Sequence, residues 1–215
     1  MAFTSYGNLT TAIASWLHRS DLSSYVDDFV ALGESRIYSD LRIRQMETTT
    51  GSTISSGVIS VPSNYVEMKD ARISSLSPNV KLERKSAEWI YEYYPDRTAT
   101  GIPAFIARDG SNFIFGPYPD ATYVVTLNFY NRLAALSSAT NSIYTSYPGL
   151  YLFAALAETA PFLKDDKRVV LWEAKYQDLL KKVQTESDKE EWSGSNLRIT
   201  SDYQTSRIHQ IKLSA

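Results

Sequence analysis

Two ends with helical periodicity enclose a middle with strand periodicity, and this order is the sequence feature that most constrains the fold. Apolar residues recur every three or four positions in residues 1–46 and again in residues 147–192. Residues 47–146 instead hold short runs rich in Thr, Val, Ile and aromatic residues, separated by Gly and Pro. The sequence therefore predicts an α+β fold, in which an antiparallel β module is inserted into a helical bundle.

The bundle is expected to contain four helices, two before the insertion and two after it. Gly33 lies inside the second helix, where it costs about 1 kcal/mol relative to Ala, so we expect close packing there. The third helix is expected to end near Leu163, and Asp165-Asp166 to cap the fourth. The apolar stripe predicted for the fourth helix comprises Val169, Val170, Trp172, Tyr176, Leu179, Leu180 and Val183.

The inserted module shows several strand signals and one short helix. Strands are expected near residues 54–61, 70–75 and 80–84, and Asp109-Gly110 is typical of a hairpin turn. A helix is expected from about Ser86, a good N-cap, to Tyr94. The run from Tyr123 to Tyr130 is apolar on both faces, which predicts a central strand covered on both sides.

Residues 193–215 form the third part of the chain. They show neither helical nor strand periodicity, and their apolar residues are isolated. Such a segment cannot bury itself locally, so we expect an extended C-terminal tail that lies against a partner. The residues expected to make that contact are Leu197, Ile199, Tyr203, Ile208, Ile211 and Leu213.

Composition argues against several classes of protein. The chain has no cysteine, which excludes disulfides, thiol catalysis and thiolate zinc sites, and its two histidines, His18 and His209, lie at opposite ends. With a net charge of −2, the chain has no overall positive potential that would favour binding to nucleic acid. No apolar run approaches the roughly 20 residues of a membrane span, and the N-terminus does not resemble a signal peptide. We expect a soluble protein with no cofactor, no metal and no membrane partner.

Motifs for catalysis are also missing. None of the nine glycines forms G-x-G, and neither G-K-[ST] nor G-x-S-x-G occurs. Pairs of carboxylates serve glycosidases, but each acidic cluster here lies beside Lys or Arg where capping or solvation explains it. These clusters are Asp27-Asp28, Glu34, Asp165-Asp166 and Glu190-Glu191. The residues predict no catalytic site, and a hydrolase with an unrecognised carboxylate pair stays as an alternative.

Aromatic residues are unusually frequent, with 15 Tyr, 8 Phe and 4 Trp. Large amphipathic rings anchor protein interfaces at low entropic cost, so this composition favours a protein that works by contact. The run Trp89-Ile90-Tyr91-Glu92-Tyr93-Tyr94 is also compatible with a platform for stacking sugars. A carbohydrate-binding module is therefore a second alternative.

Five stretches of the chain, in order, are similar to a family of head-to-tail adaptor (connector) proteins from tailed bacteriophages. Together they cover most of residues 5–192, and Gly33 and Gly149 replace the family's usual Ala and Asp. The most specific is YPGLYLFAALAE at residues 147–158, which continues through PFLKDD to Trp172. The others are LGESRIYSDLRIRQME (32–47), VPSNYVE (61–67), TGIP (100–103) and FGPYPD (115–120).

The resemblance, which includes similarity to the adaptor of short-tailed phages, implies a structural protein of the virion neck, assembled in the host cytoplasm. It implies a ring of roughly twelve copies beneath the portal protein, which extends the channel for double-stranded DNA and docks tail or nozzle proteins. We further expect Asp27, Asp28 and Glu34 to face the channel, because repulsion lets DNA slide during ejection. A tail-fibre-like module that uses its tyrosines for sugar binding is the alternative reading.

Overall fold

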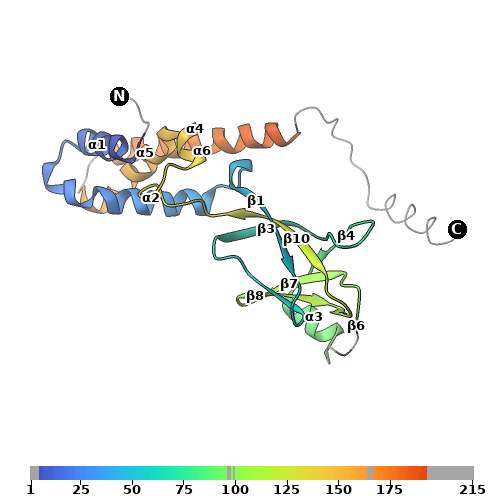
Figure 1. Cartoon of the computed structure of the whole chain (residues 1–215). Helices are drawn as coiled ribbons and strands as arrows, with labels where there is room; N and C mark the ends of the chain where they lie inside the picture. The colour runs from blue at the N-terminus through green and yellow to red at the C-terminus, as the bar shows by residue number, and fades with distance from the viewer. Residues whose placement is uncertain (1–4, 96–97, 99, 164–166, 193–215) are drawn as a thin grey trace.

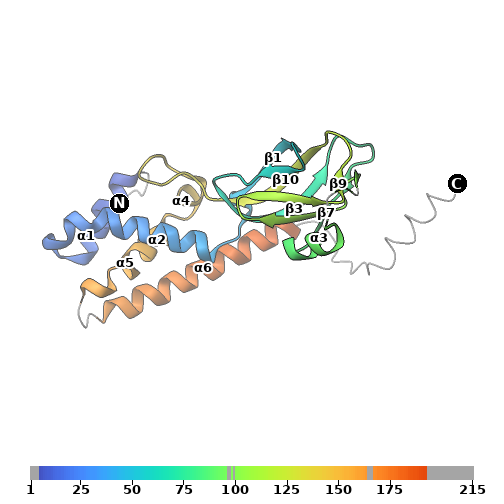
Figure 2. The same ribbon diagram turned by 90° about the horizontal axis from the view of Figure 1, so that it is seen from below.

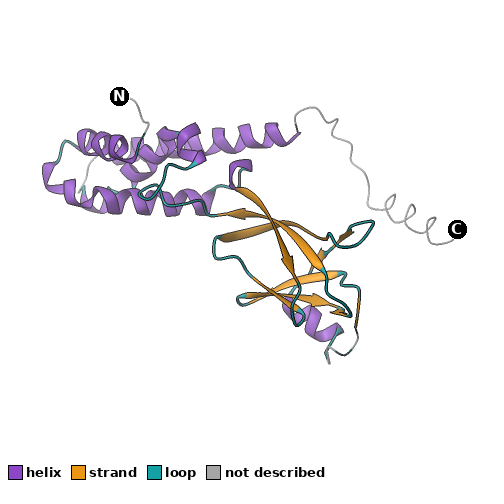
Figure 3. Ribbon diagram, viewed as in Figure 1, coloured by secondary structure: helices purple, strands orange, loops and turns teal. Residues whose placement is uncertain are grey.

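The computed structural model describes residues 5–95, 98, 100–163 and 167–192. Helices from both ends of the sequence pack together, and the strands form a separate β module beside them (Figures 1 and 3). The α+β class is thus confirmed. The helices of the helical region are α1 (Tyr6–Leu17), α2 (Val26–Asp40), α4 (Ser142–Ser146), α5 (Pro148–Ala157) and α6 (Arg168–Trp192), with 3-10 turns η1 (Ser20–Tyr25), η2 (Arg44–Met46) and η3 (Ala160–Phe162).

Local capping chemistry sets the ends of the first helices. The Ser5 side chain accepts a hydrogen bond from the Asn8 N–H at 3.3 Å, which starts α1. His18 adopts the left-handed conformation, with φ of 51°, and ends it. The 3-10 turn η1 follows, and it leads directly into α2.

Two expectations for the later helices need correction. The third helix does not continue to Leu163, since α5 ends at Ala157 and the chain goes on through η3. Pro161 lies in that turn, and a proline in a helix interior removes a backbone donor and clashes with the preceding turn. Val170 is 75% exposed, because it falls beside the stripe of α6 that buries Trp172, Tyr176 and Val183. The proposed Asp165-Asp166 cap lies outside the described residues.

Gly33 fits a close approach between α2 and α5. A Cβ atom at Gly33 would lie 2.8 Å from the Ala155 backbone nitrogen and 3.2 Å from the Ala154 Cβ. Both alanines are fully buried in the core that α1, α2, α4, α5 and α6 share. Close packing at this glycine, expected from the sequence, is confirmed.

The β module contains two four-stranded sheets and a two-stranded pair. The first sheet has the order β1 (Glu47–Thr53), β10 (Val124–Asn131), β3 (Tyr65–Ile73) and β4 (Val80–Lys81). The second has the order β2 (Val58–Ser60), β8 (Asn112–Gly116), β7 (Phe105–Asp109) and β5 (Glu83–Arg84). The remaining pair is β6 (Thr100–Gly101) with β9 (Tyr118–Pro119). Side chains from both four-stranded sheets form one core, which includes Ile73, Leu127, Phe129, Ile106 and Phe113.

Several local predictions for this module are confirmed. Gly110 takes a φ of 57° in the turn between β7 and β8, as the hairpin requires. The helix α3 (Ala87–Tyr93) begins at Ser86, whose hydroxyl accepts from the Trp89 N–H at 3.2 Å. The strand pairing is mixed rather than purely antiparallel, because β5–β7 and β6–β9 are parallel.

The prediction for β10 is half right. It lies between β1 and β3, as a central strand should. Only one of its faces is fully buried, however, through Val125, Leu127 and Phe129, whereas Val124 on the other face is exposed. The second sheet covers just one side of the first, so the opposite face carries partly exposed residues such as Thr126.

The long helix α6 joins the helical region to the β module. It runs alongside α2, and its C-terminal end reaches the strands (Figure 2). The Lys69 ammonium on β3 contacts Glu47 at 2.6 Å and Glu191 of α6 at 2.8 Å. The backbone N–H of Arg44 donates to the Ser187 hydroxyl at 3.0 Å. These contacts set the position of the β module on the end of α6.

Replacing Gly33 by Ala tests the close approach. Because the new methyl group would meet backbone atoms of α5, we expect a loss of about 1–3 kcal/mol in the free energy of unfolding, despite the better helix propensity of Ala. Urea unfolding followed by circular dichroism measures it. The matched control is Gly7→Ala in α1, where no atom lies within 4 Å of the added Cβ. Equal stability of the two variants would contradict the close packing.

Candidate interaction surfaces

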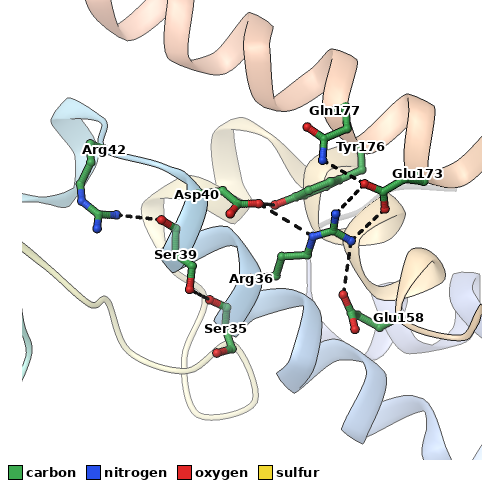
Figure 4. A network of polar contacts seen from close by, with 9 residues as sticks. All are labelled: Ser35, Arg36, Ser39, Asp40, Arg42, Glu158, Glu173, Tyr176 and Gln177. Carbon is green, nitrogen blue, oxygen red and sulfur yellow. Dashed lines mark hydrogen bonds and ion pairs between the residues drawn. The ribbon is translucent and has the colours of Figure 1, made fainter. Parts of the chain in front are cut away.

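Arg36 of α2 is the centre of a charged network that ties three helices together (Figure 4). Its guanidinium donates to both carboxylate oxygens of Glu173 on α6, at 2.8 and 2.5 Å, and to Glu158 at 3.3 Å just after α5. The same group lies 4.4 Å from the centroid of the Tyr176 ring. The bidentate geometry orients α6 against α2 as well as attracting it.

The electrostatics of this network follow from its geometry. The hydrogen bonds from Arg36 lower the pKa of the Glu173 carboxyl, since they stabilise its charged form. The Tyr176 hydroxyl donates to Asp40 at 2.9 Å, and burial together with this hydrogen bond raises the pKa of Tyr176. Each carboxylate near Arg36 thus has a donor, and the cluster joins α2 to α6.

Glu34 sits in a second, buried polar network on α2. Its carboxylate accepts from the Leu136 N–H at 3.1 Å, from the Asn141 amide at 3.3 Å and from the Tyr38 hydroxyl at 3.4 Å. Asn141 in turn accepts from the Tyr151 hydroxyl at 3.1 Å. Burial raises the pKa of the Glu34 carboxyl. These contacts anchor the segment between β10 and α4 to the helical core.

The expectation that Glu34 faces a channel stays a prediction, and within the single chain this side chain is buried. Only 8% of Glu34 is exposed, and its oxygens bind groups of its own chain. Asp27 and Asp28 are exposed on the first turn of α2, where the Tyr6 hydroxyl donates to Asp27 at 2.6 Å. All three acidic residues line one hollow of about 240 Å³, with Glu34 at its inner side.

Exposed apolar residues gather at the end of the helical region farthest from the β module. The connections from α1 to α2 and from α5 to α6 both lie there (Figures 1 and 2). The rings of Tyr25 and Phe162 are 5.5 Å apart, and Arg168 donates to the Trp16 carbonyl at 3.1 Å. We name the exposed side chains at this end the distal apolar residues: Trp16, Tyr25, Phe162, Val170 and Leu171.

The β module presents aromatic side chains on α3, at its end away from the helical region. The rings of Trp89 and Tyr93 stack with centroids 4.3 Å apart, and Tyr93 is 63% exposed. The Lys85 ammonium lies 5.2 Å from the Trp89 ring centroid, and the Tyr91 hydroxyl donates to Asp109 at 2.6 Å. The molecule thus exposes aromatic groups at both ends.

Sequence reasoning located some of these groups and missed others. The aromatic run on α3 was visible in the sequence, but the exposure of Leu171 and Phe162 was not inferred. The position of Leu171 beside the stripe of α6 is the signal that was available. The predicted tail contacts Leu197, Ile199, Tyr203, Ile208, Ile211 and Leu213 lie outside the described residues, so they stay a prediction.

Within the described ranges, no three His, Cys, Asp or Glu residues come together in a way that could hold a metal ion. Nor does any helix in those ranges have the length and apolar character to cross a bilayer. What the structure does present is an elongated shape whose two ends carry exposed aromatic and apolar groups. Exposed apolar groups of this kind are typical of surfaces that contact other macromolecules.

Comparison with known proteins specifies the class. Residues 4–199 match the SU10 adaptor protein family, and the chain belongs to that family. It is thus a phage head-to-tail adaptor, with a structural role in tail assembly. No curated protein matches the chain.

Substituting Arg36 tests its network. In Arg36→Gln, Glu158, Glu173 and Asp40 lose their shared cation, and we expect a loss of about 1–3 kcal/mol in unfolding free energy at neutral pH. The lowered pKa of Glu173 means that its stabilisation is present above the unfolded-state pKa and is lost as pH falls through the folded-state value. The deficit of the variant should therefore shrink below about pH 4.

Urea titrations at pH 7 and pH 3.5 measure this deficit. The control is Arg19→Gln, because the pair between Arg19 and Asp21 is exposed and should contribute little to stability. A deficit for Arg36→Gln that is the same at both pH values would show that charge plays no part in it.

Substitution of Glu34 tests the buried network, and the effect on stability should depend on pH in the opposite sense to that of Arg36→Gln. Glu34→Gln keeps an acceptor and removes a buried charge, so at pH 7.5 it should be at least as stable as the natural chain. Glu34→Ala leaves the Leu136 N–H and Asn141 unpaired and should cost about 1–3 kcal/mol. With a raised folded-state pKa, the contribution of Glu34 is full below its unfolded-state pKa and is lost as pH rises.

The natural chain should therefore gain stability relative to Glu34→Gln as the pH is lowered from 7.5 to 5. Thermal unfolding of the three proteins at both pH values provides the measurement. If Glu34→Gln proved as unstable as Glu34→Ala at pH 7.5, the assignment of Glu34 as a buried acceptor would be wrong.

Proposed function

We propose that this chain is the connector between the head and tail of a tailed phage. It forms a ring of about twelve copies beneath the portal protein, extends the DNA channel and docks tail or nozzle proteins. Membership of the adaptor family and the elongated, two-ended shape support this proposal. The observation that carries it is the set of distal apolar residues, which a lone chain leaves in water.

The ring is built by contacts between helical regions of neighbouring copies. Residues 1–46 and 147–192 act as one domain in this arrangement, together with α4, which packs into the same core. The strands of residues 47–146 form a second domain that projects toward the tail. In a ring, one face of each copy contacts a different face of the next copy. Apolar side chains such as Leu171, which is 57% exposed, supply the apolar area buried in that interface. Residues 193–215 leave the body and lie against the portal or a neighbouring copy.

Asp27 and Asp28 face the bore of the ring in this proposal. Both are exposed on the first turn of α2, so their charges are available to repel the phosphate backbone of passing DNA. Repulsion keeps double-stranded DNA from binding during ejection. The protein thus acts in the neck of the virion as a structural component and not as an enzyme.

A carbohydrate-binding or tail-fibre-like module is the alternative, and the α3 aromatic residues are the feature that bears on it. A sugar platform needs open ring faces. Trp89 gives a face to Tyr93 and lies beside Lys85, so much of its area is already used within the chain. The geometry favours the connector proposal.

Electron microscopy of the full chain mixed with its portal protein tests the connector proposal. We expect a ring on the portal with distal apolar residues at the contacts between copies. Leu171→Glu should prevent ring completion, because it puts a charge into a contact that excludes water. Lys175→Glu, a change of an exposed polar residue on the same helix, is the matched control.

Three outcomes would count against the proposal. Rings that form equally well with Leu171→Glu would remove the distal apolar residues from the interface. A lumen lined mainly by Lys and Arg would reject the role of Asp27 and Asp28. A protein lacking residues 193–215 that still attaches fully to the portal would reject the role given to the tail.

A further inference from the structure

A small hollow opens between the two four-stranded sheets of the β module, and it shares Lys85 with the surface around α3. Its volume is about 170 Å³. Three cations surround it, namely Arg84 at the end of β5, Lys85 next to it, and Arg108 on β7. Tyr65, Met68 and Phe113 supply the rest of its wall. The hollow therefore combines a cationic rim with an aromatic wall.

Neutral contacts hold the two arginines in place. The Arg84 Nη1 donates to the Met68 carbonyl at 2.8 Å. The Arg108 Nε donates to the Gly110 carbonyl at 3.1 Å, and its guanidinium lies 5.4 Å from the Tyr65 ring centroid. Each guanidinium is thus oriented by a group that carries no charge, and most of its five N–H donors are not used by these bonds.

Neither arginine has an anionic partner among residues 5–95, 98, 100–163 and 167–192. This distinguishes them from Arg36, Arg42 and Arg72, each of which pairs with a carboxylate within those ranges. The acidic groups close in sequence are engaged elsewhere, since Glu83 pairs with Lys85 and Asp109 accepts from Tyr91. Two oriented, unpaired guanidinium groups beside one hollow form a receptor for an anion.

We propose that the hollow between Arg84 and Arg108, the arginine cradle, receives a carboxylate side chain of the tail-side protein that docks on the β module. This inference rests on the proposed function, in which that module meets the tail. The planar guanidinium fork matches the two oxygens of a carboxylate. Arginine beside buried aromatic rings is also the composition of energetically dominant interface positions.

A protein carboxylate fits better than a nucleic-acid backbone. Binding to DNA spreads over successive phosphates and needs cations along a track. Here Arg84, Lys85 and Arg108 converge on a single hollow of about 170 Å³. One acidic side chain inserted between Arg84 and Arg108 satisfies both guanidinium groups.

Fluorescence anisotropy on the full chain tests the cradle, with a labelled hexaglutamate peptide as probe in low salt. We expect Arg84→Gln and Arg108→Gln each to weaken binding about tenfold, the change that corresponds to 1.4 kcal/mol, and the double variant to abolish it. The matched control is Arg72→Gln, which removes an equal charge from a paired arginine on β3 and should leave binding within about twofold. Circular dichroism confirms that each variant is folded.

Two results with these probes would overturn the cradle. One is an absence of hexaglutamate binding to the natural chain, or binding that the double variant retains. The other is tighter, cradle-dependent binding of an oligothymidylate of equal charge, which would show that phosphate is the ligand.

The failure of this inference is separable from the failure of the proposed function. In micrographs with portal and tail-side proteins, the double variant should complete the ring but not hold the tail-side protein. A ring that holds that protein normally rejects the cradle and leaves the connector function intact. Absence of a ring with the natural chain rejects the connector function itself.

Discussion

The close approach of α2 to α5 is the contact on which the rest of the structure depends. These helices are separated in sequence by the whole β module, so closing the helical core costs the entropy of a long loop. Gly33 lets the backbones meet without an intervening side chain, and Arg36, one turn further on, joins α2 to Glu173 of α6. Since α6 also contacts β3 through Glu191, the position of the β module depends on the same packing.

Two charged residues of α2 stabilise this arrangement in different ways. Arg36 is half-buried and surrounded by carboxylates, so its charge is compensated by charge. Glu34 is buried and hydrogen-bonded to neutral donors, and the charge of Arg132 adds a smaller attraction. As the pH rises and carboxyl groups ionise, the Arg36 network stabilises the fold more. The Glu34 network stabilises it less, because burial disfavours the charged form of Glu34. Both fix the rotation of α2, which an apolar stripe alone would leave less defined.

The long helix also separates the surfaces that an adaptor must present. The distal apolar residues lie at one end of the helical region, and α3 with its aromatic rings lies on the far side of the β module (Figure 1). In the proposed ring, contacts to neighbouring copies and contacts to the tail would thus be made by different parts of one chain. The ends of α6 are fixed by Arg168 on one side and by Ser187 and Glu191 on the other.

The sequence by itself determined the features that depend on short-range geometry. The α+β class, the hairpin at Asp109-Gly110 and the helix after Ser86 follow from periodicity, turn chemistry and capping, and ordered motifs identified the family. Only the tertiary structure decided that Glu34 points inward, that one face of β10 stays open and that Val170 lies outside the core. Periodicity reports which residues share a face of an element, but burial depends on which distant segment covers that face. For α2, that segment follows the β module, where Leu136 and Asn141 supply the donors that make a buried carboxylate stable.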